Sequence, residues 1–282
     1  MKSPTISVIT VTRNRRDLLL RKLKSLSEQT MFPEQFELVL CINGDEEGTL
    51  EAIKQVSTPF AIKLITFPEN RGVSAGRNAC ARLAKGQLLY FSDDDCLLRQ
   101  ENLQTHVHAH AGKAGVYQGG IRWHHRDGRY RDLRPQRFQY WNLHTDFSIS
   151  ATQFWEVGGF PEWLGGYGHE DVLLGFKLRE AGYPLVALTS VVTDHIGPDP
   201  TMTAQVDKAS SAGSNAVEIA KRYPKTAFRL GVKPWMLTIK WFLLSPPISP
   251  LVFLLGADKV AYEKAYCEGA IAKWKEIHSD RS

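Results

Sequence analysis

The sequence has few cysteines and no long uninterrupted apolar run. Four cysteines occur among 282 residues, far apart and without a CxxC pair, so neither a disulfide framework nor a cysteine zinc site is expected. The N-terminal residues lack the charged and apolar regions of a secretory signal. We therefore expect a cytoplasmic protein rather than a secreted, disulfide-rich or fibrous one.

Two common nucleotide-binding sequences are also missing. No GxGxxG follows the first strand-like segment, which argues against a dinucleotide-binding protein. No GxxxxGK[ST] occurs, which excludes a P-loop. What is present is an ordinary globular composition, 43% hydrophobic and 23% charged, which supplies a sizeable core. The net charge of +5, from 35 basic and 30 acidic residues, favours anionic partners only mildly.

Apolar strand-like segments alternate with helical ones in the N-terminal third of the chain. Strands are expected at 6–11, 36–42, 62–67 and 88–91, and helices at 17–28, 50–56 and 74–84. This alternation is typical of a parallel sheet covered on both faces. Because ligands of such sheets bind beyond the carboxyl ends of the strands, the loops after the strands are the candidate site.

An acidic segment, Ser92-Asp93-Asp94-Asp95, follows the expected strand at 88–91. In an extended chain, Asp93 and Asp95 share one face and Asp94 points to the other. Two carboxylates on one face suit Mg²⁺ or Mn²⁺, which keep positions open for phosphate oxygens. A solvated acidic turn is the alternative, but the position at a carboxyl strand end favours the cation site.

Two further polar groups occur later in the chain. Three glycines precede Glu170 and Asp171 at the expected start of a helix over 172–180. Adjacent helical positions point about 100° apart, so one carboxylate is expected to hold an acceptor and the other to accept its proton. A helix N-terminus behind a flexible loop is the alternative. Farther on, the imidazole of His195 is a suitable third metal ligand, although a lone histidine is more often structural.

Five sequence segments occur in a distinctive order. They are PTISVITVTRNR at 4–15, NRGVSAGRN at 70–78, LYFSDDD at 89–95, and VGGFPE at 157–162 with GHED at 168–171. Their order and spacing resemble glycosyltransferase family 2, and the likeness covers about residues 4–200. The resemblance implies a GT-A fold of the α/β class: a Rossmann-like, mostly parallel nucleotide-binding sheet flanked by helices, with a C-terminal helical extension.

The resemblance also implies a division of the chain. Residues 1–200 would form the catalytic domain, with a nucleotide-binding half over 1–97 and an acceptor-binding half over 98–200. Residues 201–282 would form a C-terminal helical region.

The activity implied by the resemblance is that of an inverting, metal-dependent hexosyltransferase acting in bacterial polysaccharide or envelope glycan synthesis. Asp171 would be the base and Glu170 its partner. Mn²⁺ or Mg²⁺ would be held by Asp93, Asp95 and His195. The donor would be a nucleoside-diphosphate sugar, with UDP favoured over GDP or dTDP. The residues implied to bind it are Thr12, Arg13, Asn43, Asp45, Asn70, Gly72, Arg77, Asp93 and Asp94.

Two positions depart from the family's pattern. Where the family often has D-D-G-S, this chain reads Ile42-Asn43-Gly44-Asp45, so a carboxylate expected to contact the base is missing or displaced. Leu173 stands where a further acidic residue often follows.

Two other function classes are weighed against this one. A sugar nucleotidyltransferase would need a glycine-rich loop with a basic residue after the first strand, and 12–16 offers none. A catalytically silent nucleotide-sugar-binding protein would be expected to lose one of four residues that are all present: Asp93, Asp95, Asp171 and His195.

Two more segments carry charged and aromatic residues. Arginines and aromatic residues interleave over 122–141, where an acceptor-side loop for an anionic or sugar-phosphate acceptor is favoured over nucleic-acid binding. Three histidines lie at 106, 108 and 110, but only His106 and His110 share a helical face, so a solvated helix is favoured over a metal site.

The C-terminal region contains apolar stretches over 235–255. Lys240 and a proline-rich insert at 245–250 interrupt them, so no membrane-spanning helix is expected. Basic residues and tryptophans suit peripheral contact with the anionic inner face of the cell membrane, which would give access to a lipid-linked acceptor. A helical subdomain that packs on the sheet or forms a homodimer is the alternative, with a glycan or small molecule as acceptor.

Overall fold

The computed structural model describes residues 3–45, 47–134, 143, 146–199, 201–245 and 256–279. The chain divides into two compact units. One comprises Met1–Pro161 with Leu174–Asp199, and the other comprises Glu162–Leu173 with Pro200–Ser282. The first unit holds the sheet, and the second consists mainly of helices.

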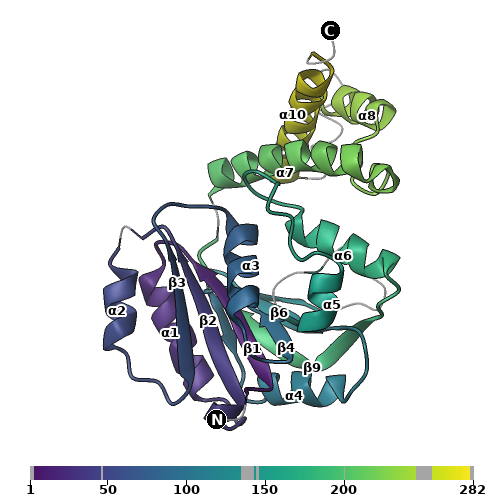
Figure 1. Ribbon diagram of the computed structural model, residues 1–282. Helices are drawn as coiled ribbons and strands as arrows, with labels where there is room; N and C mark the ends of the chain where they lie inside the picture. The colour runs from purple at the N-terminus through teal and green to yellow at the C-terminus, as the bar shows by residue number, and fades with distance from the viewer. Residues whose placement is uncertain are drawn as a thin grey trace. The chain divides into compact units, whose positions relative to one another are not determined.

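The N-terminal half of the sheet is parallel, as Figure 1 shows. Its strands run in the order β3 (Ala61–Phe67), β2 (Phe36–Asn43), β1 (Ile6–Thr12) and β4 (Leu88–Phe91). The connecting helices are α1 (Arg16–Ser27), α2 (Thr49–Gln55) and α3 (Val73–Leu83), and a short 3-10 helix, η1 (Pro33–Gln35), precedes β2. The strands and helices expected in this half are confirmed.

Both faces of this parallel half are buried under helices. Alternate residues of β1 point to opposite faces. Ile6 and Val8 join a core cluster with Leu23 of α1, whereas Ile9 joins a second cluster with Cys80 of α3. This two-sided burial explains why the strands read as continuous apolar runs.

The second half of the sheet contains antiparallel pairs. β8 (Phe147–Ser150) pairs antiparallel with β4, then come β6 (Val116–His124), β9 (Leu185–His195) and β5 (Cys96–Leu98), and β7 (Tyr130–Leu133) pairs with β6. β9 is parallel to β6. The helices of this half are α4 (Asn102–His110), α5 (Ala151–Glu156) and α6 (Glu170–Glu180), the last of which begins in the second unit. The expected α/β fold class is confirmed.

Helix α4 is not the solvated helix that its histidines suggested. His106 and His110 are 0% and 5% exposed, and both contact the Ser148 hydroxyl, at 2.7 and 2.9 Å. The buried Asp146 carboxylate lies 3.4 Å from Nε2 of His106. The expectation was wrong because the polar partners of these imidazoles lie about 40 residues away, on and beside β8.

The second unit contains α7 (Met202–Arg222), the 3-10 turn η3 (Pro224–Thr226), α8 (Pro234–Leu244) and α10 (Ala257–Ser279). α7 and α10 meet at two glycines. A Cβ atom on Gly213 would lie 2.0 Å from the Tyr266 carbonyl oxygen, and one on Gly269 would lie 2.0 Å from that of Ser210. Only glycine allows the two backbones to approach so closely. Within the described helices, none is both long enough and apolar enough to cross a membrane.

Candidate functional site

The carboxyl ends of β1, β2 and β4 meet at one edge of the sheet because these strands are neighbours and parallel. Thr12 ends β1, Asn43 ends β2, and the acidic loop Ser92–Asp95 follows β4. The structure therefore brings together side chains that are more than 80 residues apart in the sequence, such as Thr12 and Asp94.

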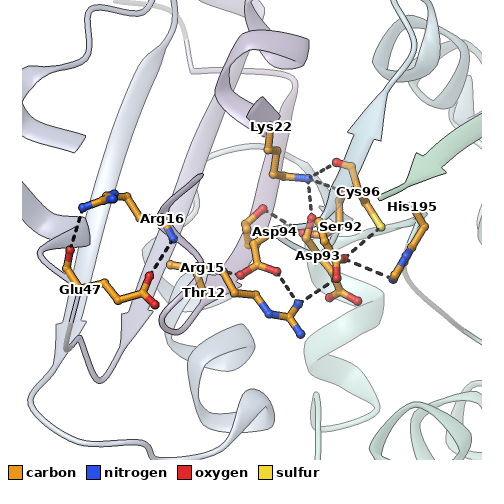
Figure 2. Close-up of polar contacts among 12 residues, drawn as sticks. Thr12, Arg15, Arg16, Lys22, Glu47, Ser92, Asp93, Asp94, Cys96 and His195 are labelled. Carbon is orange, nitrogen blue, oxygen red and sulfur yellow. Dashed lines mark hydrogen bonds and ion pairs between the residues drawn. The ribbon is translucent and has the colours of Figure 1, made fainter. Parts of the chain in front are cut away.

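The acidic loop turns instead of continuing in the extended form assumed from the sequence. The backbone N–H of Cys96 donates to the Asp93 carbonyl oxygen at 3.2 Å, which closes a turn around Asp94 and Asp95. Nη1 of Arg15 donates to both carboxylates of the turn, at 3.1 Å for Asp94 and 2.8 Å for Asp95. Figure 2 shows Arg15 beside Asp94. Because the same guanidinium also donates to Asp95, it holds two neighbouring carboxylates together.

Two further side chains, Thr12 and Arg77, contact the carboxylates of this loop. The Thr12 hydroxyl donates to Asp94 at 2.7 Å, and Nη2 of Arg77 donates to Asp93 at 2.8 Å. Asp94 and Asp95 are buried, whereas the Asp93 side chain is 39% exposed. Asp93 therefore points to a different partner from Asp94 and Asp95.

The charges in the loop respond to burial and to these partners. Burial raises the pKa of Asp94 to about 6, although the Arg15 guanidinium opposes this change. Burial also acts to raise the pKa of Asp93, but the ion pair with Arg77 outweighs it, and the pKa of Asp93 is lowered. Asp93 is therefore the more readily ionised of the two carboxyl groups.

Lys22 of α1 forms hydrogen bonds with the same loop, a role that was not predicted from the sequence. Its side chain is fully buried, and Nζ donates to the Ser92 hydroxyl at 2.7 Å and to the carbonyl oxygens of Asp93 and Cys96 at 2.9 and 3.1 Å. Burial lowers the pKa of Lys22. A signal was present in the sequence, because Lys22 lies three residues after Leu19, on the apolar face of α1.

His195 faces the acidic loop from the end of β9. Its ring Nε2 lies 3.4 Å from Oδ1 of Asp95, because β5 and β9 pair Cys96 directly with His195. The imidazole stacks on Trp123, with ring centroids 3.9 Å apart. Its Nδ1 is buried and has no hydrogen-bond partner. Such a nitrogen is the kind of ligand that a cation would satisfy.

Asp95, Cys96 and His195 have ligand atoms within 4.8 Å of one another and could hold a metal ion. A Cβ atom at Gly197 would lie 2.3 Å from Oδ2 of Asp95, so only glycine leaves room beside this carboxylate. Burial, with the negative charges of Asp93 and Asp95, raises the pKa of the Cys96 thiol well above its usual value. The oxygen and nitrogen donors of Asp95 and His195 thus fit Mn²⁺ or Mg²⁺, while the thiol stays protonated.

Asn43 and Asn70 shape the loop that follows β3. The Asn43 amide donates to Oδ1 of Asn70 at 2.9 Å and to the Gly72 carbonyl oxygen at 3.2 Å, and its own oxygen accepts from the Arg71 backbone. Gly72 has a φ of +83°, which favours glycine, and precedes α3 directly. The buried Asn43 amide therefore holds the loop in which Asn70 and Gly72 lie.

Arg13 lies in the loop after β1, and Asp45 lies in the loop after β2. The Asp45 carboxylate accepts from the backbone N–H groups of Glu47 and Leu50, at 3.2 and 3.1 Å, and so supports the start of α2. Burial would raise the pKa of Asp45, but these hydrogen bonds lower it. Arg13 is exposed after β1.

Asn78 is a second residue whose structural role had not been assigned. Its side-chain amide donates to the Phe160 carbonyl oxygen at 2.9 Å and its side-chain oxygen accepts from the Phe160 N–H at 3.0 Å. A backbone segment 82 residues away is thereby tied to α3. Phe160 also lies under the Arg77 guanidinium, 5.1 Å from ring centroid to Cζ.

Glu170 and Asp171 occupy the first turn of α6, in the second unit. Oδ1 of Asp171 accepts from the Val172 N–H at 2.7 Å, and both carboxylates lie at the positive end of the helix dipole. His169 precedes them with a left-handed φ of +69°. Leu173 is fully buried, so the hydrophobic core occupies the position at which the family often has an acid.

The arginine-rich segment over 122–141 lies partly outside the described residues, because 135–142 are not among them. In the described part, Arg122 pairs with Asp132 across β6 and β7 at 2.8 Å, and Arg129 pairs with Asp127 at 2.6 Å. Each of these two arginines therefore already has a carboxylate partner.

Comparison with known proteins identifies the family to which the chain belongs. Residues 7–171, more than half of the chain, match the family described as Glycosyl transferase family 2. The chain belongs to this family. The resemblance inferred from the sequence motifs is thereby confirmed.

Curated relatives extend this likeness. The chain is 30% identical over 226 residues to Validoxylamine A glucosyltransferase of Streptomyces hygroscopicus subsp. limoneus, covering 64% of this chain and 49% of that protein. It is 27% identical over 207 residues to glycosyltransferase AglE of Haloferax volcanii, covering 68% and 67%. The chain thus spans about half the length of the first of these relatives.

Solved structures share the fold. A mannosyltransferase from Pyrobaculum calidifontis, in complex with GDP-Man and Mn²⁺, aligns with a TM-score of 0.68 at 19% identity, covering 97% of this chain and 87% of that one. S. aureus TarS 1-349 in complex with UDP-GlcNAc aligns with a TM-score of 0.57 at 15% identity, covering 96% and 92%. At these identities the likeness shows the GT-A fold alone.

Proposed function

We propose that this glycosyltransferase moves a hexose from a nucleoside-diphosphate sugar to an acceptor hydroxyl, with inversion at the anomeric carbon. The observation that carries the proposal is the polar cluster at the carboxyl ends of β1 and β4, where Arg15, Asp95 and His195 meet. Sheets of this class bind nucleotides at that edge.

The cluster would hold a divalent cation, Mn²⁺ or Mg²⁺, through Asp95 and His195. When bound, the cation neutralises charge on the leaving diphosphate. Asp93 was expected as a second carboxylate ligand. Its carboxylate is paired with Arg77 and is not part of the group of ligand atoms formed by Asp95, Cys96 and His195. The proposal therefore assigns Asp93 to holding Arg77, whose guanidinium is a suitable diphosphate ligand.

The proposed donor is a UDP-sugar, with a GDP-sugar or a dTDP-sugar as alternatives. The related structures were solved with GDP-Man and Mn²⁺ in one case and with UDP-GlcNAc in the other, which supports a nucleotide-sugar donor. Arg13, Asn70 and Gly72 are the proposed nucleoside contacts. Thr12, Asn43 and Asp45 hold the surrounding loops in place.

Asp171 is the proposed base for the acceptor hydroxyl, and Glu170 is proposed to hold the acceptor. Support comes from their position in the first turn of α6, where the helix dipole favours the ionised carboxylates. General-base assistance of this kind typically contributes about 10²–10⁴-fold to the rate. The acceptor would be a glycan, lipid-linked or small-molecule hydroxyl of a bacterial polysaccharide or envelope pathway.

The test is donor hydrolysis by the full chain. UDP-, GDP- and dTDP-hexoses are incubated with the protein and Mn²⁺, and free nucleoside diphosphate is measured, with Asp95→Asn as the inactive variant and the exposed Asp127→Asn as matched control. We expect release from one donor by the wild type and by Asp127→Asn only. Pyrophosphate release from a nucleoside triphosphate and a sugar 1-phosphate would instead show a nucleotidyltransferase, and tight binding without release would show a silent binding protein.

A second proposal concerns location, and α8 of the second unit supports it. Trp235, Ile239 and Phe242 are 55%, 51% and 63% exposed on a helix that follows the basic residues Arg229 and Lys233. Exposed aromatic residues beside basic ones suit shallow attachment to an anionic membrane surface. The segment 246–255 that continues this region lies outside the described residues.

Sedimentation with vesicles tests this location. We expect the protein to pellet at low salt with anionic vesicles and to remain in the supernatant with neutral ones. The triple substitution of Trp235, Ile239 and Phe242 by serine should abolish pelleting. Equal recovery in both supernatants would reject the membrane proposal and leave the homodimer, measured by light scattering, as the use of this face.

A further inference from the structure

A polar pocket lies entirely within the second unit. Its volume is about 330 Å³, and its walls come from the loop before α6, from α7 and from α10. Ligand pockets commonly measure about 300–1,000 Å³, so this one has room for a group of monosaccharide size. None of the residues assigned above to donor, metal or base lines it.

The charge of the pocket walls is unbalanced. Lys273, Glu218 and Arg222 are the charged residues that line it. Nζ of Lys273 lies 2.9 Å from an oxygen of Glu218, so these two lining charges offset each other, and 2.7 Å from an oxygen of Glu276, which does not line the pocket. Among the described residues, no carboxylate is paired with Arg222. The guanidinium therefore leaves a positive charge in the pocket.

Arg222 lies over an aromatic ring. Its Cζ lies 3.8 Å from the centroid of the Trp163 ring, a stacking distance for a cation and an indole. In a stacked guanidinium the N–H groups lie in the plane parallel to the ring, where they are available to an incoming anion. A planar fork of this kind recognises carboxylate or phosphate oxygens in pairs.

The remaining walls suit a hydroxyl-rich ligand. Ser214 and Asn215 are polar lining residues, and Gly165 and Gly166 contribute backbone groups. Gly166 must be glycine here, because its φ is +64° and a Cβ atom would lie 2.4 Å from Oγ of Ser211.

The pocket is connected by hydrogen bonds to the segment that carries the proposed base. Oγ of Ser211, a lining residue, accepts from the Tyr167 N–H at 2.7 Å. The Asn215 amide donates to the Gly168 carbonyl oxygen at 2.9 Å. Asp171 follows only three residues after Gly168. A ligand in the pocket therefore contacts the same side chains that fix this loop.

We propose that this pocket binds an acidic sugar unit of the acceptor, with Arg222 on its carboxylate or phosphate group and the Ser214 side chain on its hydroxyl groups. The inference rests on the proposed transferase function, for which it names the acceptor class. It requires no change in the donor site.

The test is binding of monosaccharides to the full chain, measured by calorimetry. Glucuronate and glucose 6-phosphate are compared with glucose, and Arg222→Gln is compared with Lys221→Gln, a neighbouring exposed cation outside the pocket. We expect one acidic sugar to bind at least about tenfold more tightly than glucose, the effect of one charge-assisted pair. Arg222→Gln should remove this preference and Lys221→Gln should keep it. The better ligand distinguishes carboxylate from phosphate.

Equal binding of all three sugars, binding of none, or an unchanged preference in Arg222→Gln would overturn the inference. Acceptor-independent donor hydrolysis separates its failure from that of the proposed function. Arg222→Gln should hydrolyse donor as the wild type does. A wild type that binds acidic sugars but hydrolyses no donor would retain the pocket and refute the transferase proposal.

Discussion

Replacing Lys22 by methionine tests whether one buried ammonium holds the acidic loop. Methionine has a similar length and volume but cannot donate a hydrogen bond. The change removes the donor from the Ser92 hydroxyl and from the carbonyl oxygens of Asp93 and Cys96. All three acceptors lose their contact with Nζ at once.

The expected cost follows from these three contacts. A buried polar group left without a partner costs about 1–3 kcal/mol. Three such groups would cost several kcal/mol, but methionine also avoids the penalty for burying a charged ammonium, the same penalty that lowers the pKa of Lys22. We therefore expect the free energy of unfolding to fall by a net ~2–4 kcal/mol.

The assay is equilibrium unfolding in urea, with Lys24→Met as matched control. Lys24 lies one half-turn along the same helix but is exposed, so its substitution should change stability by less than about 0.5 kcal/mol. Lys22→Met should also weaken UDP binding, because the loop that carries Asp95 loses its support. Equal stability of the two variants would refute the claim that Lys22 fixes this loop.

Three further outcomes follow from the site. Asp95→Asn should lower the metal-dependent affinity for UDP at least about tenfold in calorimetry, and an undiminished affinity would remove Asp95 from the metal site. Asp171→Asn should keep donor affinity but lose about 10²–10⁴-fold in transfer rate, whereas wild-type turnover would move the base to Glu170. Burial lowers the pKa of His169 from 6.5 to about 4, so between these values the unfolded chain binds a proton that the folded chain does not, and stability should fall as the pH drops through this window. The variant His169→Asn keeps a residue that tolerates the left-handed φ of this position. In urea unfolding at pH 4.5 and 7, it should reduce the difference in unfolding free energy between the two pH values by about 2 kcal/mol. An unchanged difference would show that this imidazole is protonated in the folded state.

Much of the fold and part of the site could be predicted from local patterns. The strands at 36–42 and 88–91 and the helix at 74–84 were expected from runs and spacings that lie within a dozen residues, and β2, β4 and α3 bear them out. The acidic loop was placed at a carboxyl strand end, where the structure has it. Such features are predictable because side-chain alternation and helical periodicity act over short windows.

The partners within the site could not be predicted in the same way. The sequence pattern predicts an extended segment over 92–95, with Asp94 on the opposite face from Asp93 and Asp95. The structure turns the loop and groups Asp94 with Asp95 on Arg15 instead. The prediction of a solvated helix for the histidines of α4 was wrong for the same reason. The Ser148 hydroxyl, from another part of the chain, forms hydrogen bonds with both imidazoles.

The sequence by itself determined the order of strands and helices in the N-terminal third, the loops proposed to bind ligands and, through the spacing of its motifs, the family. Only the tertiary structure decided which charges are paired, which polar atoms are buried and where a pocket remains. The reason is distance along the chain. Arg15 reaches Asp95 across 80 residues and Lys22 reaches Ser92 across 70, and such contacts exist only because β1 and β4 lie side by side in the sheet.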